Sequence, residues 1–135
     1  MGYSYGTKCK KCGNEKNYLL GFGYNTPQCL DNVIAVNKNR KEKEFFEYIA
    51  KNRNAKLVQP VGYRLYECPT CKTLHSKLYI EVKYGENERY VKQYNCSKCG
   101  SILVPLPDDV DASEFRCKKC GEKALEESKS FILWD

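Results

Sequence analysis

The sequence predicts a mostly β fold with a small helical insertion, built from two β-hairpin units that metal ions hold together. Eight of the nine cysteines form four C-x-x-C pairs, and each pair lies between two segments of extended pattern. Hydrophobic residues make up 41% of the chain, but this class includes 9 Cys and 11 Tyr. The remaining apolar residues form too small a core for a stable domain without additional cross-links.

The first 24 residues predict two strands joined by a cysteine turn, which is our term for a C-x-x-C pair and the residues that reverse the chain around it. Tyr3, Tyr5 and Thr7 alternate with other residues before the first pair. The segment "NYLLGFGY" resumes an extended pattern after that pair. Alternation of this kind is typical of a half-buried β-strand.

A helical insertion is expected at about 27–53. Thr26 followed by Pro27 is typical of a helix N-cap and first helical position. In "RKEKEFFEYIAKNR", apolar side chains recur at helical spacing beneath a charged face. Cys29 lies among apolar residues of this insertion, and we expect it to be buried because free cysteine is among the most buried residue types.

The pattern of strand, cysteine turn and strand recurs in the rest of the chain. It appears around the second pair, after Pro60, and again around the third and fourth pairs. The polar segment 85–88 is the best candidate for a domain boundary. We therefore expect an N-terminal domain at 1–84, which contains the helical insertion, and a compact C-terminal domain at 88–135.

The cysteine pairs predict tetrahedral metal centres. Two residues between the cysteines let the chain reverse and place both sulfurs about 2.3 Å from one ion. Glycine follows three of the pairs, where it can adopt a positive φ without strain. The second pair, in "CPTCK", has Lys72 at that position.

Three pairings of the four turns are possible, and loop length favours the sequential one. Its second site has the spacing C-x2-C-x17-C-x2-C, within the usual range for zinc sites, whereas 55 residues separate the two halves of its first site. Short loops also cost less entropy to close. The sequential sites are Cys9, Cys12, Cys68 and Cys71 (site 1) and Cys96, Cys99, Cys117 and Cys120 (site 2). A nested pairing, in which the two "CKKCG" copies meet, and a crossed pairing remain open.

The repeated unit consists of a strand, a CxxCG turn and a second strand. Two such units paired together resemble the zinc ribbon with its rubredoxin-type cysteine turns. The resemblance covers 88–135 well and covers 1–84 only if a ribbon accepts the helical insertion. The whole chain is similar to small bacterial double zinc-ribbon proteins that begin with a "MGYSY"-like strand and end in "LWD". This resemblance implies the fold and two Zn²⁺ ions, with iron as a possible substitute, and implies no activity.

Charge and targeting patterns predict a soluble, cytoplasmic protein. The chain begins without a signal-peptide pattern, and it has no apolar run near the roughly 20 residues that span a membrane. Eight thiolates and two Zn²⁺ ions lower the formal net charge from +6 to about +2. Residues 1–60 contain 11 Lys and Arg against 5 Asp and Glu, so the basic surface is expected in the first half.

These features predict a non-enzymatic zinc-binding module that contacts nucleic acid or a nucleoprotein through its basic, Tyr-rich N-terminal half. The candidate contacts are Lys8, Lys10, Lys11, Lys72, Tyr3 and Tyr5. The same lysines can instead offset thiolate charge, and tyrosine is also an ordinary strand residue. One alternative is a protein–protein adaptor that uses the helical insertion and the C-terminal "FILWD". A more distant alternative is a rubredoxin-like iron electron carrier.

Catalysis has little support in the sequence. His75 is the only histidine, and no Cys–His–acid arrangement is evident. His75 can replace a cysteine as a metal ligand, but eight cysteines already fill two sites. Two complete sets of thiolates leave no open position for a substrate or water on either metal.

Overall fold

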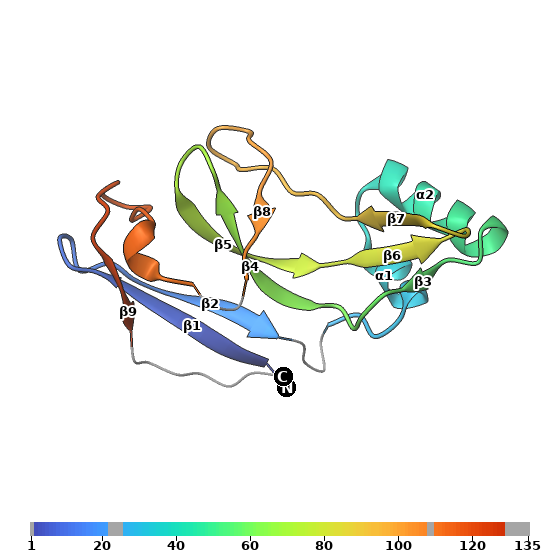
Figure 1. Ribbon diagram of the computed structural model, residues 1–135, viewed down its shortest axis with the longest axis horizontal. Coiled ribbons are helices and arrows are strands. Elements are labelled where there is room, and N and C mark those ends of the chain that lie inside the picture. Colours follow the sequence, from blue (N-terminus) through green and yellow to red (C-terminus); the bar gives the residue numbers. More distant parts are fainter. Residues whose placement is uncertain (1, 22–25, 108–109, 129–135) are drawn as a thin grey trace.

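The computed structural model describes residues 2–21, 26–107 and 110–128, which form two antiparallel sheets and two α-helices (Figure 1). Most elements are strands, as the sequence predicts. The strands are β1 (Gly2–Cys9), β2 (Glu15–Gly21), β3 (Lys56–Leu57), β4 (Gly62–Cys68), β5 (Thr73–Tyr79), β6 (Glu81–Tyr84), β7 (Glu88–Val91), β8 (Val104–Pro105) and β9 (Leu125–Ser128). The helices are α1 (Leu30–Val36), α2 (Arg40–Asn52) and a short 3-10 helix, η1 (Ala112–Glu114).

The larger sheet has the strand order β5-β4-β2-β1-β9, with β8 paired to the side of β4. It contains two regular hairpins, β1–β2 and β4–β5, whose connections are the first two cysteine turns. The hairpins pair with one another at a single position, Gly21 opposite Tyr63. They are therefore joined at one end of β2, and the rest of β2 is free of backbone pairing with β4.

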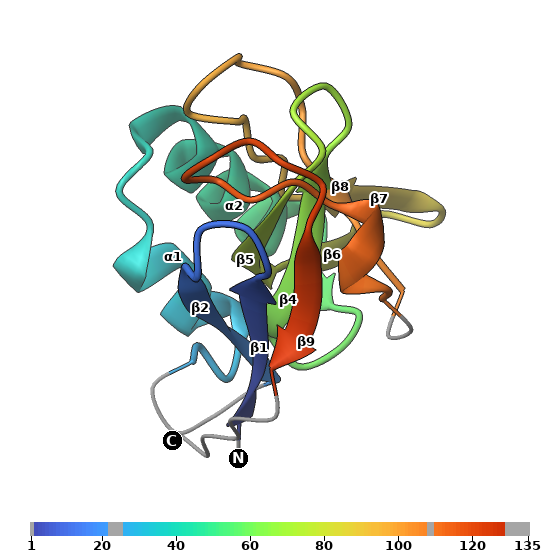
Figure 2. The ribbon, with the colours of Figure 1, turned by 90° about the vertical axis from the view of Figure 1, so that its left-hand side faces the viewer.

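Strands from the C-terminal part of the chain complete this sheet. β9 pairs with β1 from Gly6 opposite Ser128 to Cys9 opposite Leu125, so the two ends of the described chain lie side by side (Figure 2). β8 pairs with β4. The predicted domains 1–84 and 88–135 thus share one sheet, and the predicted boundary at 85–88 is the tight turn of the β6–β7 hairpin.

The helical insertion packs on the smaller sheet, which has the order β3-β6-β7 (Figure 1). α2 begins after Asn39, whose side chain accepts a hydrogen bond from the backbone N–H of Glu42 and so caps the helix. Phe46 and Ile49 of α2 are buried against this sheet. Both helices lie within the predicted range 27–53, and neither is long and apolar enough to cross a membrane.

Glu42 ties α2 to the smaller sheet. Its carboxylate accepts hydrogen bonds from the Tyr90 hydroxyl at 2.6 Å, from the Asn37 amide at 2.8 Å and from the Lys92 ammonium. Burial raises the pKa of this carboxyl, but the bonds from Lys92, Tyr90 and Asn37 outweigh burial, so its pKa is lower than usual. The ionised form of Glu42 therefore contributes to the docking of the helix.

Candidate metal centres and lysine cleft

The four cysteine turns share one local geometry. In each, the residue after the second cysteine donates its backbone N–H to the carbonyl of the first, at 2.8–2.9 Å. These residues have positive φ angles: Gly13 at 75°, Lys72 at 58°, Gly100 at 77° and Gly121 at 76°. Lys72 therefore adopts the left-handed conformation that glycine provides in the other three turns, at a cost in strain.

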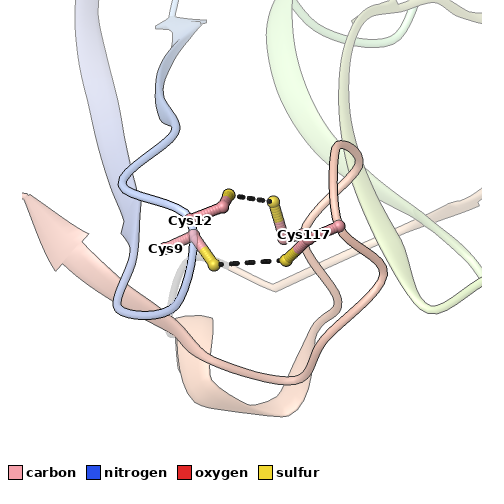
Figure 3. Close-up of side chains that lie close together, drawn as sticks. Cys9, Cys12 and Cys117 are labelled. Atoms are coloured by element: carbon pink, nitrogen blue, oxygen red, sulfur yellow. Dashed lines mark hydrogen bonds between the residues drawn. The ribbon is translucent and has the colours of Figure 1, made fainter.

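The first and fourth turns meet and form the outer centre, which consists of Cys9, Cys12, Cys117 and Cys120. All four Sγ atoms lie within 4.8 Å of one another. The Sγ atoms of Cys9 and Cys120 are 3.6 Å apart, as are those of Cys12 and Cys117. Figure 3 shows the sulfurs of the β1–β2 turn facing those of the turn that precedes β9.

The second and third turns form the inner centre, which consists of Cys68, Cys71, Cys96 and Cys99. Its Sγ atoms also lie within 4.8 Å of one another, and those of Cys68 and Cys99 are 3.4 Å apart. The hydroxyls of Thr70 and Ser101 are 2.8 Å apart and link the two turns. Each centre thus joins two turns that are far apart in the sequence.

Both centres have the size and donors that a tetrahedral metal ion requires. Four sulfurs at 2.3 Å from one ion are separated by about 3.8 Å; the three shortest sulfur contacts are 3.4–3.6 Å, and all sulfurs of a centre lie within 4.8 Å of one another. The backbone N–H of Cys71 points to Cys68 Sγ at 3.3 Å, and that of Lys119 points to Cys117 Sγ at 3.4 Å. Such N–H groups favour thiolates, so each centre can hold one ion.

Neighbouring groups act on the thiols of the inner centre in opposite directions. The Ser101 hydroxyl, 3.3 Å from Cys99 Sγ, lowers the pKa of that thiol to about 6. Hydrogen bonds to the sulfurs of Cys99 and Cys68 raise the pKa of Cys71 to about 12, because these bonds favour its protonated form. A metal ion bound by all four sulfurs would displace that proton.

The sequential pairing predicted from loop length is wrong, and the nested one is observed. The register of β9 on β1 places Cys9 opposite Leu125, and the backbone N–H of Lys10 donates to the carbonyl of Ala124 at 2.8 Å. In the same way, the pairing of β8 with β4 brings the third turn beside the second. Each doubling of loop length costs only about 0.6 kcal/mol, so the preference for short loops is worth about 1 kcal/mol. Strand pairing exceeds that amount.

The predicted nucleic-acid contacts are scattered in the structure. Lys8 and Lys10 have acidic partners, Glu15 and Glu126, each at 3.9 Å. Lys11 and Lys72 are exposed at the tips of their turns. The ring of Tyr3 is exposed, whereas that of Tyr5 packs on the core of the larger sheet and its hydroxyl donates to the carbonyl of Val110 at 3.3 Å.

Three other sequence predictions have different outcomes. Cys29, expected to be buried, is exposed at the N-cap of α1 because the apolar face of that helix begins at the next residue. His75 belongs to neither sulfur centre and bonds to Thr73. The C-terminal "FILWD" lies outside the described residues.

A basic cleft that no sequence pattern indicated is lined mainly by β2 and β5, with Tyr63 of the intervening β4 also in its wall. It has a volume of about 310 Å³, and none of the described residues that line it is acidic. We call it the lysine cleft. It is lined by Lys16, Asn17, Tyr18 and Leu19 of β2, by His75, Ser76 and Lys77 of β5, and by Tyr63 and Lys118.

Hydrogen bonds fix the protonation of His75 in this cleft. The Lys118 ammonium lies 3.5 Å from Nδ1, and the Thr73 hydroxyl lies 2.9 Å from Nε2. Because an ammonium only donates, Nδ1 accepts, and Nε2–H donates to Thr73. Burial, together with the positive charges of Lys118, Lys77 and Lys16, lowers the pKa of His75 to about 4. His75 is therefore neutral at pH 7.

The cleft depends on the nested pairing. Lys118 lies in the fourth turn, and the outer centre brings that turn beside β2 and β5. The carbonyl of Lys118 also accepts a hydrogen bond from Lys98 at 3.3 Å, so the third turn, which belongs to the inner centre, contacts the fourth turn, which belongs to the outer centre. The sequential pairing gave no reason to group Lys118 with Lys16, and the sequence offers no other signal that does.

No family model, curated protein or solved structure matches this chain. The zinc-ribbon resemblance therefore depends on the cysteine turns and their arrangement in two four-sulfur clusters.

Proposed function

We propose that the protein is a non-enzymatic module, held together by two structural Zn²⁺ ions, that binds nucleic acid. The observation that supports this most directly is the donor set: four cysteine sulfurs surround each metal position. Four thiolates complete a tetrahedral shell and leave no place for a water molecule or substrate on the ion. The metals then stabilise the fold, and the surface performs the function.

Unpaired positive charge supports nucleic acid as the partner. Among the residues that the structure describes, Lys16, Lys77 and Lys118 lie together without an ion-paired carboxylate. Clustered lysines attract phosphates and release counterions when they bind. Tyrosines beside them offer ring faces on which bases can stack.

Two measurements test the proposal. Native mass spectrometry should find two zinc ions per chain, and a protein that is red as purified would instead identify ferric iron and favour the electron carrier. Binding to a labelled oligonucleotide should weaken steeply as salt rises from about 50 to 200 mM. Absence of binding even at the lower salt concentration would refute the nucleic-acid part.

A protein–protein adaptor is a second candidate, because the helical insertion exposes two large apolar side chains. Val36 is 63% exposed and Tyr48 is 58% exposed. An adaptor surface at the helices predicts that Tyr48→Ser abolishes partner binding while oligonucleotide affinity stays unchanged. Binding to a protein partner through apolar contacts would also persist at high salt, unlike binding to phosphates.

A further inference from the structure

The lysine cleft concentrates positive charge that the described protein does not neutralise. Lys16 is exposed, whereas Lys77 and Lys118 are half-buried, and none of the three has an ion-paired carboxylate among the described residues. Half-burial of like charges raises the free energy of the fold unless a partner compensates it. An anion in the cleft would supply that compensation.

Tyrosine rings hold the three ammonium groups in place. The ammonium of Lys16 lies 5.9 Å from the ring centroid of Tyr18, and that of Lys118 lies 5.6 Å from the same centroid. The ammonium of Lys77 lies 5.7 Å from the ring centroid of Tyr94. Contacts of this kind attract a cation without neutralising it. The positive potential of the cleft therefore remains available to a ligand.

A second hollow, which we call the aromatic pocket, adjoins the cleft. It encloses about 440 Å³ and shares Tyr63 with the cleft. It is lined by Tyr3, Gly21, Gln59, Pro60, Gly62, Tyr63, Arg64 and Tyr79. The Arg64 guanidinium stacks over the Tyr79 ring at 5.0 Å from its centroid. Planar groups suited to stacking on a base therefore gather here.

The two hollows follow one another along the β4–β5 hairpin, and Tyr63 lines both. Lys77 lines the cleft and Tyr79 lines the pocket. Residues two apart on a strand point to the same face, about 7 Å from each other. Arg64 lies directly opposite Lys77 on β4, so it faces the same side. A linear ligand in which charged groups and planar rings alternate at short intervals would fit the lysine cleft and the aromatic pocket together.

We propose that the lysine cleft and the aromatic pocket form one binding site for single-stranded nucleic acid. A phosphate lies among Lys16, Lys77 and Lys118, and the adjoining base stacks in the aromatic pocket. This inference rests on the proposed nucleic-acid function; it assigns that function to the lysine cleft and the aromatic pocket and names the ligand as a single strand. The base must be unpaired, because the face that stacks on a tyrosine is covered by neighbouring pairs in a duplex.

The experiment compares two three-charge variants by fluorescence anisotropy with a short labelled oligothymidine. The cleft variant is K16Q/K77Q/K118Q, and the matched control is K41Q/K51Q/K56Q, which removes three exposed charges from α2 and β3. We expect the cleft variant to bind at least about 10-fold more weakly and to lose about 0.7 of the salt slope per phosphate contact. The control should stay within about 2-fold of the wild type, which surface charges far from a site allow. Both must retain the metal content of the wild type.

A stacking variant, Tyr3→Leu with Tyr79→Leu, tests the aromatic pocket. It should weaken oligothymidine binding about 10-fold, the usual effect of losing a stacked base, and leave binding to tripolyphosphate unchanged. The wild type should also prefer the single strand to a duplex of the same length. Equal affinity for the duplex, or an unchanged affinity of the stacking variant, would overturn the single-stranded site.

The outcomes separate this inference from the proposed function. If the wild type binds oligothymidine and the cleft variant binds equally well, the site is wrong and the nucleic-acid function stands. If the wild type binds no oligonucleotide, the nucleic-acid function and this site both fail. In that case, lysine-dependent binding of tripolyphosphate would identify the cleft as a site for free phosphate compounds.

Discussion

The nested pairing of the cysteines can be tested by two double variants that differ in one position. Cys9→Ser with Cys117→Ser removes two ligands from the outer centre and leaves the inner centre complete. Cys9→Ser with Cys68→Ser removes one ligand from each centre. Each variant loses two thiols, so a difference in the number of bound zinc ions between the two variants shows which cysteines bind the same ion.

The geometry sets the expected result. Within each cluster the sulfurs lie within 4.8 Å of one another, so each cysteine is placed to serve only one of two ions. A structural zinc site contributes on the order of 10 kcal/mol of apparent binding free energy, and a tetrathiolate that loses one ligand is much weaker. We therefore expect one zinc ion per chain in Cys9→Ser with Cys117→Ser, and none in Cys9→Ser with Cys68→Ser after exposure to a moderate chelator.

Native mass spectrometry measures the metal content directly, and circular dichroism shows how much of the β-structure persists. The sequential pairing predicts the opposite result: no zinc ion in Cys9→Ser with Cys117→Ser, and one zinc ion in Cys9→Ser with Cys68→Ser. That reversal would refute the assignment of both centres. Single variants, Cys117→Ser and Cys68→Ser, serve as controls and should each lose one ion.

Three further predictions concern stability. In the cysteine turns, Lys72→Gly should stabilise the protein by up to about 1 kcal/mol because it removes the strain of a positive φ at a residue with a side chain. Gly100→Ala should cost about 1–2 kcal/mol from backbone strain alone, since its added Cβ meets no atom within 4 Å. Urea unfolding measures both free energies, and a lower stability of Lys72→Gly would show that Lys72 is not strained. Glu42→Gln should destabilise the packing of α2 on the smaller sheet by about 2 kcal/mol at pH 7, because hydrogen bonds to a charged carboxylate are lost. The pKa of Glu42 in the folded state is lowered from 4.5, so its contribution to stability is complete above pH 4.5 and is lost as the pH falls through the folded-state pKa. The difference in unfolding free energy between the wild type and Glu42→Gln should therefore narrow below pH 4.5. A difference that does not change with pH would show that ionisation of Glu42 is not the cause. Complete removal of metal by a chelator should abolish cooperative unfolding of the larger sheet, as followed by calorimetry, and a retained sharp transition would show that the apolar core suffices without the ions.

The local elements could be predicted from the sequence because short-range interactions form them. Each cysteine turn closes a hydrogen bond between residues four apart, and the residue at its end has a positive φ. The helix at Arg40–Asn52 follows from its apolar periodicity and from Asn39 at its N-cap. The eight cysteines that form the sulfur clusters were identified for the same reason, since the C-x-x-C spacing alone places two sulfurs on one ion.

The partners of those elements were decided only by the tertiary structure. The pairing of Cys9 with Cys120 depends on the register of β9 on β1, and four residue pairs in that ladder outweigh the small entropy gain of shorter loops. The lysine cleft follows from the same contact, because Lys118 reaches Lys16 and Lys77 only when the fourth turn meets the first. The sequence by itself determined how each turn folds and which cysteines are available to a metal ion. Only strand pairing across the whole chain decided which turns form one sulfur cluster and which lysines share a surface, because the sulfur contacts join residues 31 to 111 positions apart and leave no local pattern.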